Sequence, residues 1–469
     1  MATRRDQLQS YQFMTQRVIS AFVMRETDPQ QSPLRRGIGA VFGGLMIAVL
    51  VAAGFGVYGI FSKVGSGNWK ADGAVVIEKE TGASFVYLGG TLHPTLNYAS
   101  ALLAAGRPNP QVFRVAGNSL GGVPRGTTVG IPGAPNSLPP VKKRTGLPWT
   151  VCTIPGTDSS GRVVSTVGLA VSMTPSGARQ LSDEGILVRD EERGSTYLVW
   201  HGRRHLVQQS RIVVAALFGA VTPTMAGTAW LNSLPAGLDI TPIQVNNRGT
   251  SSSAVKGRKV GDLLVTETGS GPQAYLVFDD GLAPITPLQQ AILAAEHQVD
   301  PIQVNVSDAT SAPRSSRLPS QTGDAPPPST PPTLVTPGGN DQLCAVTGEA
   351  KSTPTISVGG TVDGLSSAAP TPSTSKDGAT LADRVLVPAG RVVIARVLAA
   401  PTAETGTYYV ITDLGIRYAA SSAGTLPLLG YRPELAVDVP ANLITRLPAG
   451  PTLDPVAAMQ PAPINASSR

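Results

Sequence analysis

The stretch ILVRDEERGSTYLVWHGRRHLVQQSRIVVAALFG, residues 186–219, decides the fold of this chain. Two apolar segments flank a short charged turn, and a second turn at Gly202 precedes a run of small apolar residues. Alternating apolar residues around a short polar turn predict a β-hairpin. The small apolar run that follows favours a helix. We therefore expect a hairpin followed by a helix.

Three other stretches share this order of parts, namely residues 75–106, 263–296 and 393–430. Each has an apolar strand, a polar turn, a strand that starts near an aromatic residue, a turn with glycine and a small-residue helix. In one of them, Thr286 followed by Pro287 predicts a helix start. Two related segments, SLPAGLDITP from Ser233 and RLPAGPTLDP from Arg446, follow two of the copies. We call the chain that leaves each copy in this way its exit segment. The irregular spacing predicts a duplicated body with insertions, not a regular solenoid.

The cluster HGRRH, residues 201–205, is the strongest candidate for a metal or catalytic centre. His201 and His205 would face a common zinc ion only on a helix, whereas Gly202 lies between them at the predicted turn. The other copies have LGGTLH, FDDGLA and TDLGIR at this place, so the glycine persists and the histidines and Arg203 and Arg204 do not. We expect a local basic turn that suits contact with an acidic neighbour better than chemistry. The charged segment 190–192 is expected to be a solvated turn.

No other motif predicts catalysis or a cofactor. GSGNWKADG from Gly65 places a lysine near glycines but lacks the spacing and the Ser or Thr of a phosphate-binding loop. There is no G-x-S-x-G nucleophile motif. Metal sites need several ligands, and the chain has only four histidines, which are His93, His201, His205 and His297. We expect no catalytic residue, no cofactor and no metal.

One apolar run, GIGAVFGGLMIAVLVAAGFGVYGIF at residues 37–61, contains no charged residue. Arg35 and Arg36 precede it and Lys63 follows it. A helix of this length spans roughly 37 Å and can cross a hydrocarbon core of about 30 Å with some tilt. Arginines concentrated before the run predict a cytoplasmic N-terminus, with most of the chain outside. Gly39 and Gly43 form a GxxxG pair that permits close packing against a partner helix.

The residues before this run predict a separate amphipathic helix. In RRDQLQSYQFMTQRVISAFVMRE, one face carries residues at three-to-four spacing, namely Leu8, Tyr11, Met14 or Thr15, Val18 and Phe22. Such a helix suits the inner membrane surface or a cytoplasmic partner.

Two cysteines, Cys152 and Cys344, both lie on the expected outer side. An even pair in that compartment predicts a disulfide, with two free buried thiols as the alternative. They lie in residues 147–182 and 343–387, which we expect to combine into a central region.

Composition sets the wider limits. The chain has 469 residues, 51 Gly, 41 Pro and a net charge of +6, which suits two or three domains with irregular connections. The positive charge is thinly spread, with no basic stripe interleaved with aromatics, so no nucleic-acid partner is expected. Residues 311–339, 366–378 and the tail from Asp454 are predicted to lack order because they offer little apolar surface to bury.

The order of parts resembles the EccB family, a membrane component of type VII (ESX) secretion systems. The resemblance covers nearly the whole chain. The residues that carry it are Tyr11 and Phe13 followed by Arg17 before the membrane run, LHPTLNYASALL from Leu92, TVGIPGAP from Thr128, a cysteine on either side of the second and third copies, and LPAGP near the end.

The resemblance implies a structural subunit of an inner-membrane secretion complex. Implied partners are the EccC motor ATPase, EccD, EccE and a mycosin protease, with self-association of the outer domain. The implied location is the inner membrane, with a single pass, a cytoplasmic N-terminus and the bulk in the periplasm. Some members of the family are called ATPases, although this sequence contains no Walker A motif.

The expected fold class is α+β: a cytoplasmic helix, one transmembrane helix, and an elongated β-rich outer domain of four hairpin–helix repeats around a disulfide-linked central region. The expected division is 1–36 cytoplasmic helix, 37–61 transmembrane helix, 62–140 repeat 1 with connector, 141–185 central region, 186–250 repeat 2, 251–310 repeat 3, 311–342 Pro-rich linker, 343–390 central region, 391–454 repeat 4 and 455–469 disordered tail.

Three functional hypotheses follow. The first is a structural subunit of the secretion channel. The second is a nucleotide hydrolase of the same complex with an unrecognised site, and the third is a cell-wall glycan-binding module.

Overall fold

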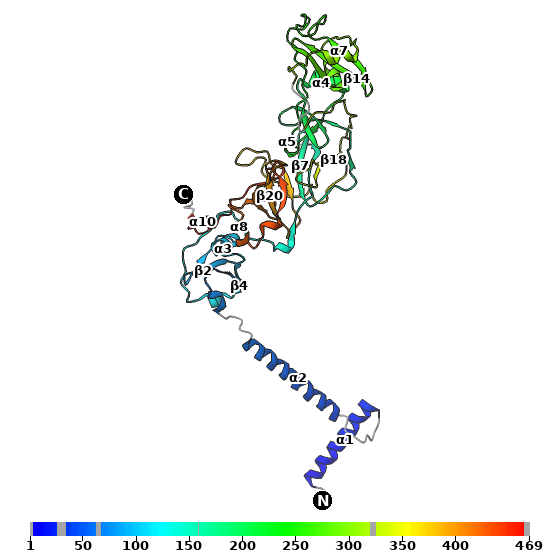
Figure 1. Cartoon of the computed structure of the whole chain (residues 1–469). Helices are drawn as coiled ribbons and strands as arrows, with labels where there is room; N and C mark the ends of the chain where they lie inside the picture. The colour runs from blue at the N-terminus through cyan, green and yellow to red at the C-terminus, as the bar shows by residue number, and fades with distance from the viewer. Residues whose placement is uncertain (1–2, 26–33, 62–66, 158, 319–324, 464–469) are drawn as a thin grey trace. The chain divides into compact units, whose positions relative to one another are not determined.

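The structure, a computed structural model, describes residues 3–25, 34–61, 67–157, 159–318 and 325–463. The chain divides into two compact units, residues 1–69 and 70–469. The first unit contains α1 (Arg4–Met24) and α2 (Leu34–Phe61), and the second contains all the strands of the described residues (Figure 1).

Helix α1 starts with a capping box. The backbone N–H of Thr3 donates to the Asp6 carboxylate at 2.9 Å, and the Thr3 hydroxyl donates to the same oxygen at 2.7 Å. Asp6 in the first turn also suits the positive end of the helix dipole. The apolar side chains that predicted this helix, including Tyr11 and Phe22, are exposed. The helix therefore presents its apolar residues to its surroundings.

Helix α2 is long and apolar enough to cross a membrane over Gly37–Val57, and it buries none of that segment within the structure. Gly39 and Gly43 have no neighbouring atom within 4 Å of an added Cβ. Arg35 and Arg36 fall in the first turn of the helix backbone. Lys63 lies outside the described residues. One apolar helix near the N-terminus fits a single-pass membrane protein.

The second unit contains four sheets with one topology, which we call sheets 1 to 4. In each sheet the first three strands form an antiparallel meander, and a fourth strand pairs in parallel with the first. Sheet 1 comprises β1 (Ala74–Glu78), β2 (Ser84–Leu88), β3 (Thr91–Pro94) and β4 (Val112–Val115). Sheet 2 comprises β9 (Ile186–Asp190), β10 (Thr196–Trp200), β11 (Arg203–Leu206) and β12 (Thr224–Ala226). Sheet 3 comprises β13 (Leu263–Thr268), β14 (Gly271–Phe278), β15 (Gly281–Ile285) and β16 (Ile302–Gln303). Sheet 4 comprises β20 (Val392–Leu398), β21 (Thr407–Ile411), β22 (Arg417–Ala419) and β23 (Val437–Pro440).

A helix connects the third strand to the fourth in every sheet. These helices are α3 (Tyr98–Ala104), α4 (Ser210–Phe218), α6 (Pro287–Glu296) and α8 (Thr425–Leu428). Helix α6 begins where Thr286 and Pro287 predict: the Thr286 hydroxyl accepts from the N–H of Gln289, and the Gln289 side chain accepts from the N–H of Thr286. A short helix follows each fourth strand, namely η2 (Gly117–Leu120), α5 (Thr228–Ser233), α7 (Val306–Ser311) and α9 (Ala441–Ile444). Further short helices are η1 (Gly67–Lys70), η3 (Val141–Lys143), η4 (Pro433–Leu435) and α10 (Pro455–Ala458).

The fifth sheet, the central sheet, combines strands from the two cysteine-bearing stretches. Its order is β19-β7-β6-β17-β18-β8. The strands are β6 (Trp149–Thr157), β7 (Val163–Val171), β8 (Arg179–Gln180), β17 (Leu343–Thr347), β18 (Thr355–Val358) and β19 (Arg384–Leu386). Strand β5 (Arg144–Thr145) instead pairs with β20 of sheet 4. Sheets 2 and 3 are therefore an insertion between the two halves of the central sheet.

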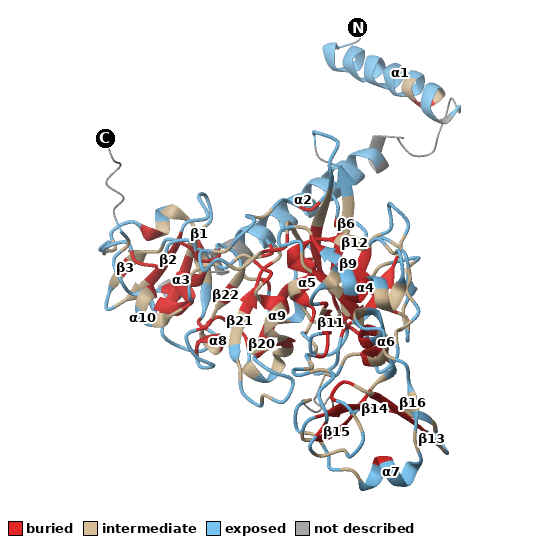
Figure 2. Ribbon diagram, turned by 90° about the horizontal axis from the view of Figure 1, so that it is seen from above, coloured by how far each residue is buried: buried red, intermediate tan, exposed pale blue. Residues whose placement is uncertain are grey.

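Shared apolar cores join these sheets. The largest core combines the central sheet with sheets 2 and 4 and includes Trp149, Trp230 and Leu447 (Figure 2). Helix α4 of sheet 2 packs against α6 of sheet 3. Helix α3 of sheet 1 packs against α8 of sheet 4 and against α10 (Figure 1). Sheets 2 and 4 thus contact the central sheet, while sheets 3 and 1 are attached to them through helices.

The segments expected to lack order are partly held by neighbouring sheets. Around residues 325–335, the N–H groups of Leu238 and Leu288 donate to the carbonyls of Ala325 and Ser329. Leu334 bridges Gly185 in parallel and packs on a core. Proline-rich chain keeps its carbonyl acceptors and lies extended, so it can dock on a partner that composition alone does not reveal.

The tail from Asp454 also differs from the expectation. The Asp454 carboxylate caps α10 by accepting from the N–H of Val456, and Ala458 is buried against α3. In residues 366–378, the N–H of Thr371 donates to the Asp383 carbonyl, and Leu381 pairs back to Ser373. Long-range packing supplies the apolar contacts that these segments lack locally.

Candidate functional site

The HGRRH cluster comprises the turn between β10 and β11, at His201 and Gly202, and the start of β11, with Trp200 paired opposite Arg203. His201 adopts a left-handed backbone with φ 46°, and its ring stacks on Trp200 at 3.9 Å between centroids. Its Nε2 lies 3.0 Å from the carboxylate of Asp183, which is almost fully exposed. A polar contact this open to water contributes little to stability.

His205 has a different environment. It is fully buried, and its Nδ1 lies 2.8 Å from the carbonyl oxygen of Leu238, so Nδ1–H is the donor. Its Nε2 is buried without a hydrogen-bond partner. The two histidines thus have separate partners, and in the described ranges no group of three or more His, Cys, Asp or Glu side chains is placed to hold a metal ion.

Arg204 belongs to an arrangement that all four sheets share. Its guanidinium lies over the ring of Tyr197 on β10, 5.7 Å from the centroid, and its Nη1 donates to the Asn232 side chain at 2.8 Å. Such a stack combines cation–π attraction with burial of the arginine stem. The equivalent pairs are Arg125 over Phe85, Arg314 over Tyr275 and Arg417 over Tyr409.

The stacking arginine occupies one of two positions that pair with each other, one on the third strand and one on the exit segment. In sheets 2 and 4 it lies on the third strand, and Arg204 and Arg417 bridge Ala236 and Ala449 of the exit segments. In sheets 1 and 3 it lies on the exit segment, and Arg125 and Arg314 bridge Leu92 and Leu282 of the third strand. Either source brings the guanidinium to the same aromatic ring.

A ring beside a glycine is a second feature, which sheets 1, 2 and 4 share. An added Cβ on Gly237 would lie 2.2 Å from the ring of His205, and one on Gly450 would lie 2.2 Å from the ring of Tyr418. In sheet 1, Gly126 and His93 repeat the pair at 2.3 Å. In sheets 1, 2 and 4 the glycine of the exit segment therefore makes room for a ring on the third strand, whereas sheet 3 has Ala283 and Ser315 at these positions.

These two features correct our interpretation that Arg204 and His205 are private to the second copy. An alignment of the copies by the number of residues after the turn glycine could have revealed the match between sheets 2 and 4. Gly202-Arg-Arg-His and Gly415-Ile-Arg-Tyr place arginine and ring at the same offsets. Only His201 and Arg203 remain specific to sheet 2.

The expectation of a solvated turn at residues 190–192 is wrong for Asp190, which is fully buried. Its Oδ1 accepts from the Thr228 hydroxyl at 2.5 Å and from the N–H of Glu192 at 3.1 Å. Glu191 turns to the central sheet and accepts from the N–H of Ser165 on β7 at 2.9 Å. Asp190 therefore ties the turn of sheet 2 to the start of α5, and Glu191 joins sheet 2 to the central sheet.

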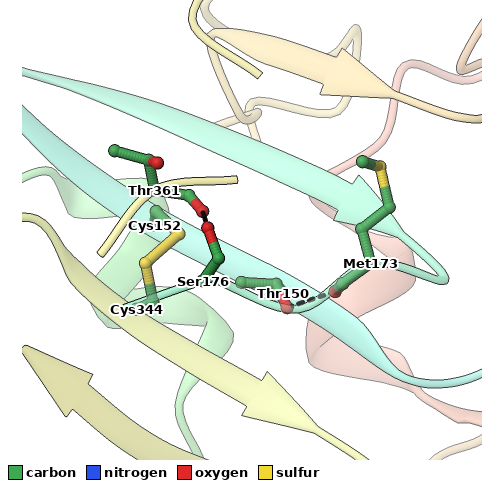
Figure 3. The surroundings of a disulfide bond; sticks show 6 residues. All are labelled: Thr150, Cys152, Met173, Ser176, Cys344 and Thr361. Atoms are coloured by element: carbon green, nitrogen blue, oxygen red, sulfur yellow. Dashed lines mark hydrogen bonds between the residues drawn. A yellow bond between two sulfur atoms is a disulfide. The ribbon is translucent and has the colours of Figure 1, made fainter. Parts of the chain in front are cut away.

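Cys152 and Cys344 form a disulfide between directly paired residues of β6 and β17. Both are fully buried, in a small core with Val362 and Leu365. Nearby, the Thr150 hydroxyl donates to the Met173 carbonyl at 2.6 Å, and Ser176 and Thr361 bridge two loops (Figure 3). The bond closes a loop with a sequence separation of 192 residues and links the two halves of the central sheet.

His205 should make stability depend on pH. Burial lowers the pKa of His205 below its ordinary value of 6.5, because a charged ring would place Nε2–H without an acceptor. Below pH 6.5 the unfolded chain binds the proton more readily than the folded chain, so stability falls as pH drops.

We expect the melting temperature to fall more between pH 7.5 and 5 in the wild type than in His205→Tyr, which copies Tyr418 of sheet 4. Carboxylates with lowered pKa values, such as Asp438, are common to both proteins and cancel in the comparison. Equal pH slopes in the two proteins would contradict the assignment.

A family model described as "Type VII secretion system ESX-1, transport TM domain B" matches residues 1–462. The ESX-5 secretion system ATPase EccB5 of Mycobacterium tuberculosis (strain ATCC 25618 / H37Rv) is 30% identical over 330 residues, which cover 67% of this chain and 64% of that protein. The chain thus spans less than two thirds of that relative's length in the match. The ESX-3 secretion system ATPase EccB3 of Mycolicibacterium smegmatis is 27% identical over 474 residues, or 96% of this chain and 89% of that protein.

Solved structures of ESX complexes also contain chains that match this one. A chain of an intact ESX-5 inner membrane complex matches with a TM-score of 0.63 and 25% identity, covering 100% of this chain and 97% of that one. A chain of an EccB3 dimer from the ESX-3 core complex matches with a TM-score of 0.61 and 26% identity, covering 82% of this chain and 100% of that one.

Proposed function

The chain belongs to the EccB family of type VII secretion systems, and from that premise we propose that it is a structural subunit of an ESX-type inner-membrane secretion complex. The family match over residues 1–462 carries this proposal. The molecule is suited to scaffolding, because one apolar helix precedes five sheets that are joined through buried cores and a disulfide.

We further propose that the N-terminus is cytoplasmic and that residues after the span lie in the periplasm. The arginines before residue 37 favour this orientation. A disulfide between buried cysteines suits an oxidising compartment on the far side. On the membrane side, Gly39 and Gly43 offer a small-residue face on α2 for a neighbouring helix.

Sheets 1 to 4 are proposed to be copies of one duplicated module. The shared strand order, the arginine over an aromatic ring and the ring beside a glycine support this origin. The proposed partners are the EccC motor ATPase, EccD, EccE and a mycosin protease, together with further copies of this chain. The similarity to a chain of an ESX-5 inner membrane complex and to a chain of an EccB3 dimer supports membership of a membrane complex and self-association, and the named partners follow from the family resemblance.

Mass determination of the complex extracted in mild detergent tests the proposal. The full-length tagged chain should be recovered in a large assembly that contains the motor ATPase. Recovery as a lone monomer under conditions that keep the other membrane subunits together would overturn it. ATP hydrolysis by the chain alone, lost on a single carboxylate substitution that leaves it folded, would favour the nucleotide-hydrolase hypothesis instead.

A further inference from the structure

A cavity of about 360 Å³ lies where sheet 2, sheet 4 and the central sheet meet. The start of β11 and the exit segment after α5 form the first wall of the cavity. The loop between β17 and β18 forms the second wall, and the end of β20 and the start of α9 form the third. The Asn442 side chain donates to the Ser233 carbonyl and so ties α9 to α5 at this wall. The cavity is therefore built by three sheets.

The charged side chains that line the cavity are all positive. Arg203, Arg204 and Lys351 line it, and no aspartate or glutamate is among its described lining residues. Within the described chain, none of these three cations forms an ion pair with a carboxylate. The nearby carboxylate of Asp438 is held by Arg396 through two hydrogen bonds of 2.6 and 2.8 Å, and after Arg396 the charge of Lys351 also lowers the pKa of Asp438. The cavity therefore presents an excess of positive charge, because this one carboxylate is shared with Arg396.

A buried guanidinium behind the wall adds to this charge. Arg446 is buried and donates to the backbone carbonyls of Thr380 and Asn442 and to the Thr445 hydroxyl, with no acidic partner. Burial first, and then the neighbouring Arg204, Arg417 and Arg193, lower the pKa of Arg446 to about 10. The group stays charged near neutral pH, and its field acts through a region of low dielectric.

Most of the remaining lining is apolar and small, with alanine, proline and leucine side chains at Leu234, Pro235, Ala236, Ala350, Pro354, Leu398, Ala399, Ala400, Pro401, Pro440 and Ala441. The other lining residues are polar and uncharged, namely Asn232, Ser233, Thr347, Ser352, Thr353 and Asn442. Binding pockets combine such walls with a few placed polar groups that fix orientation. Arginine and lysine at the edge of apolar walls suit a carboxylate joined to a short aliphatic chain.

We propose that this cavity binds an acidic peptide segment of another subunit, with a glutamate or aspartate side chain held by Arg203 and Lys351. The inference rests on the proposed scaffold role, because it gives one place for a subunit contact. It also gives His201 and Arg203, the residues specific to sheet 2, a location beside a recognition surface. The carboxylate supplies the charge that the cavity lacks, and alanine-sized neighbours fit against its walls.

The test uses the full-length chain in detergent and a fluorescent hexapeptide of alternating alanine and glutamate, followed by anisotropy at low salt. The double variant Arg203→Gln/Lys351→Gln should weaken binding at least tenfold. The double variant Arg391→Gln/Lys376→Gln loses the same charge at exposed positions outside the cavity and should bind as the wild type does. Arg204 is left unchanged because its stack on Tyr197 supports the fold.

The outcomes separate the alternatives. Loss of binding in the cavity variant alone, together with failure of the alanine–glutamine peptide to bind, supports the proposal. Equal binding of the two peptides, or equal weakening by both variants, would overturn it. Inorganic phosphate or a muropeptide binding in place of the acidic peptide would also overturn it. A cavity variant that loses the peptide yet still enters the large assembly leaves the scaffold function standing.

Discussion

Replacing Cys152 and Cys344 together with alanine is expected to lower the free energy of unfolding by about 2 to 5 kcal/mol. The cross-link joins paired residues of β6 and β17 with a sequence separation of 192, so it mainly restricts the unfolded chain. Loss of the buried sulfurs also leaves a small void beside Val362 and Leu365.

Denaturant unfolding followed by tryptophan fluorescence measures this change, since Trp149 lies on β6 itself. The dependence of the unfolding free energy on denaturant should rise in the variant, because an unfolded chain without the cross-link exposes more surface. Wild type unfolded under strong reduction provides the control and should match the variant. Equal stability of variant and oxidised wild type would show that strand pairing alone joins the two halves.

Gly202→Val is expected to cost about 2 to 5 kcal/mol, which combines backbone strain with displacement of a neighbouring loop. Gly202 has φ +72°, which a β-branched residue rarely adopts. A Cβ there would lie 2.1 Å from the carbonyl oxygen of Pro354 and 3.1 Å from the Cβ of Thr353. The backbone of the loop after β17 must therefore move.

Gly90→Val is the matched control. Gly90 is the corresponding turn residue between β2 and β3 of sheet 1, with φ +83° and no atom within 4 Å of an added Cβ. Gly90→Val introduces the same kind of backbone strain but no steric clash. Its loss of unfolding free energy should therefore be smaller than that of Gly202→Val, by the cost of moving the loop. Chemical denaturation of both variants gives the difference. Equal losses would mean that Gly202 is required for its turn alone.

The sequence predicts strands that carry a strong apolar alternation and misses those that do not. The hairpin of β9 and β10 follows directly from ILVRD and TYLVW. The third strand, Arg203–Leu206, is polar, and its outer edge pairs with the exit segment near Ala236 and Ile240. The parallel fourth strand, Thr224–Ala226, depends on a partner more than thirty residues earlier, which local periodicity does not register.

The candidate site, like the strands, could be predicted from the sequence only in part. The hairpin turn at Gly202 is visible in the sequence, while the burial of Asp190 and His205 comes from distant elements. Thr228 supplies the hydroxyl for Asp190, and Leu238 supplies the carbonyl for His205. The arginine that stacks on each aromatic ring changes chain position between sheets, so a residue-by-residue comparison of copies sees variation where the structure keeps one contact.

The insertion of sheets 2 and 3 between the halves of the central sheet fixes an order of events during biosynthesis. Strands β6 and β7 leave the ribosome before sheets 2 and 3, and β17, the partner of β6, follows only after residues 186–342 have been made. The Cys152 thiol must wait for Cys344 throughout that interval. Sheet 2 and sheet 3 can each complete their own hairpins in the meantime, whereas the central sheet is completed only after both have been made, from strands separated in time as well as in sequence.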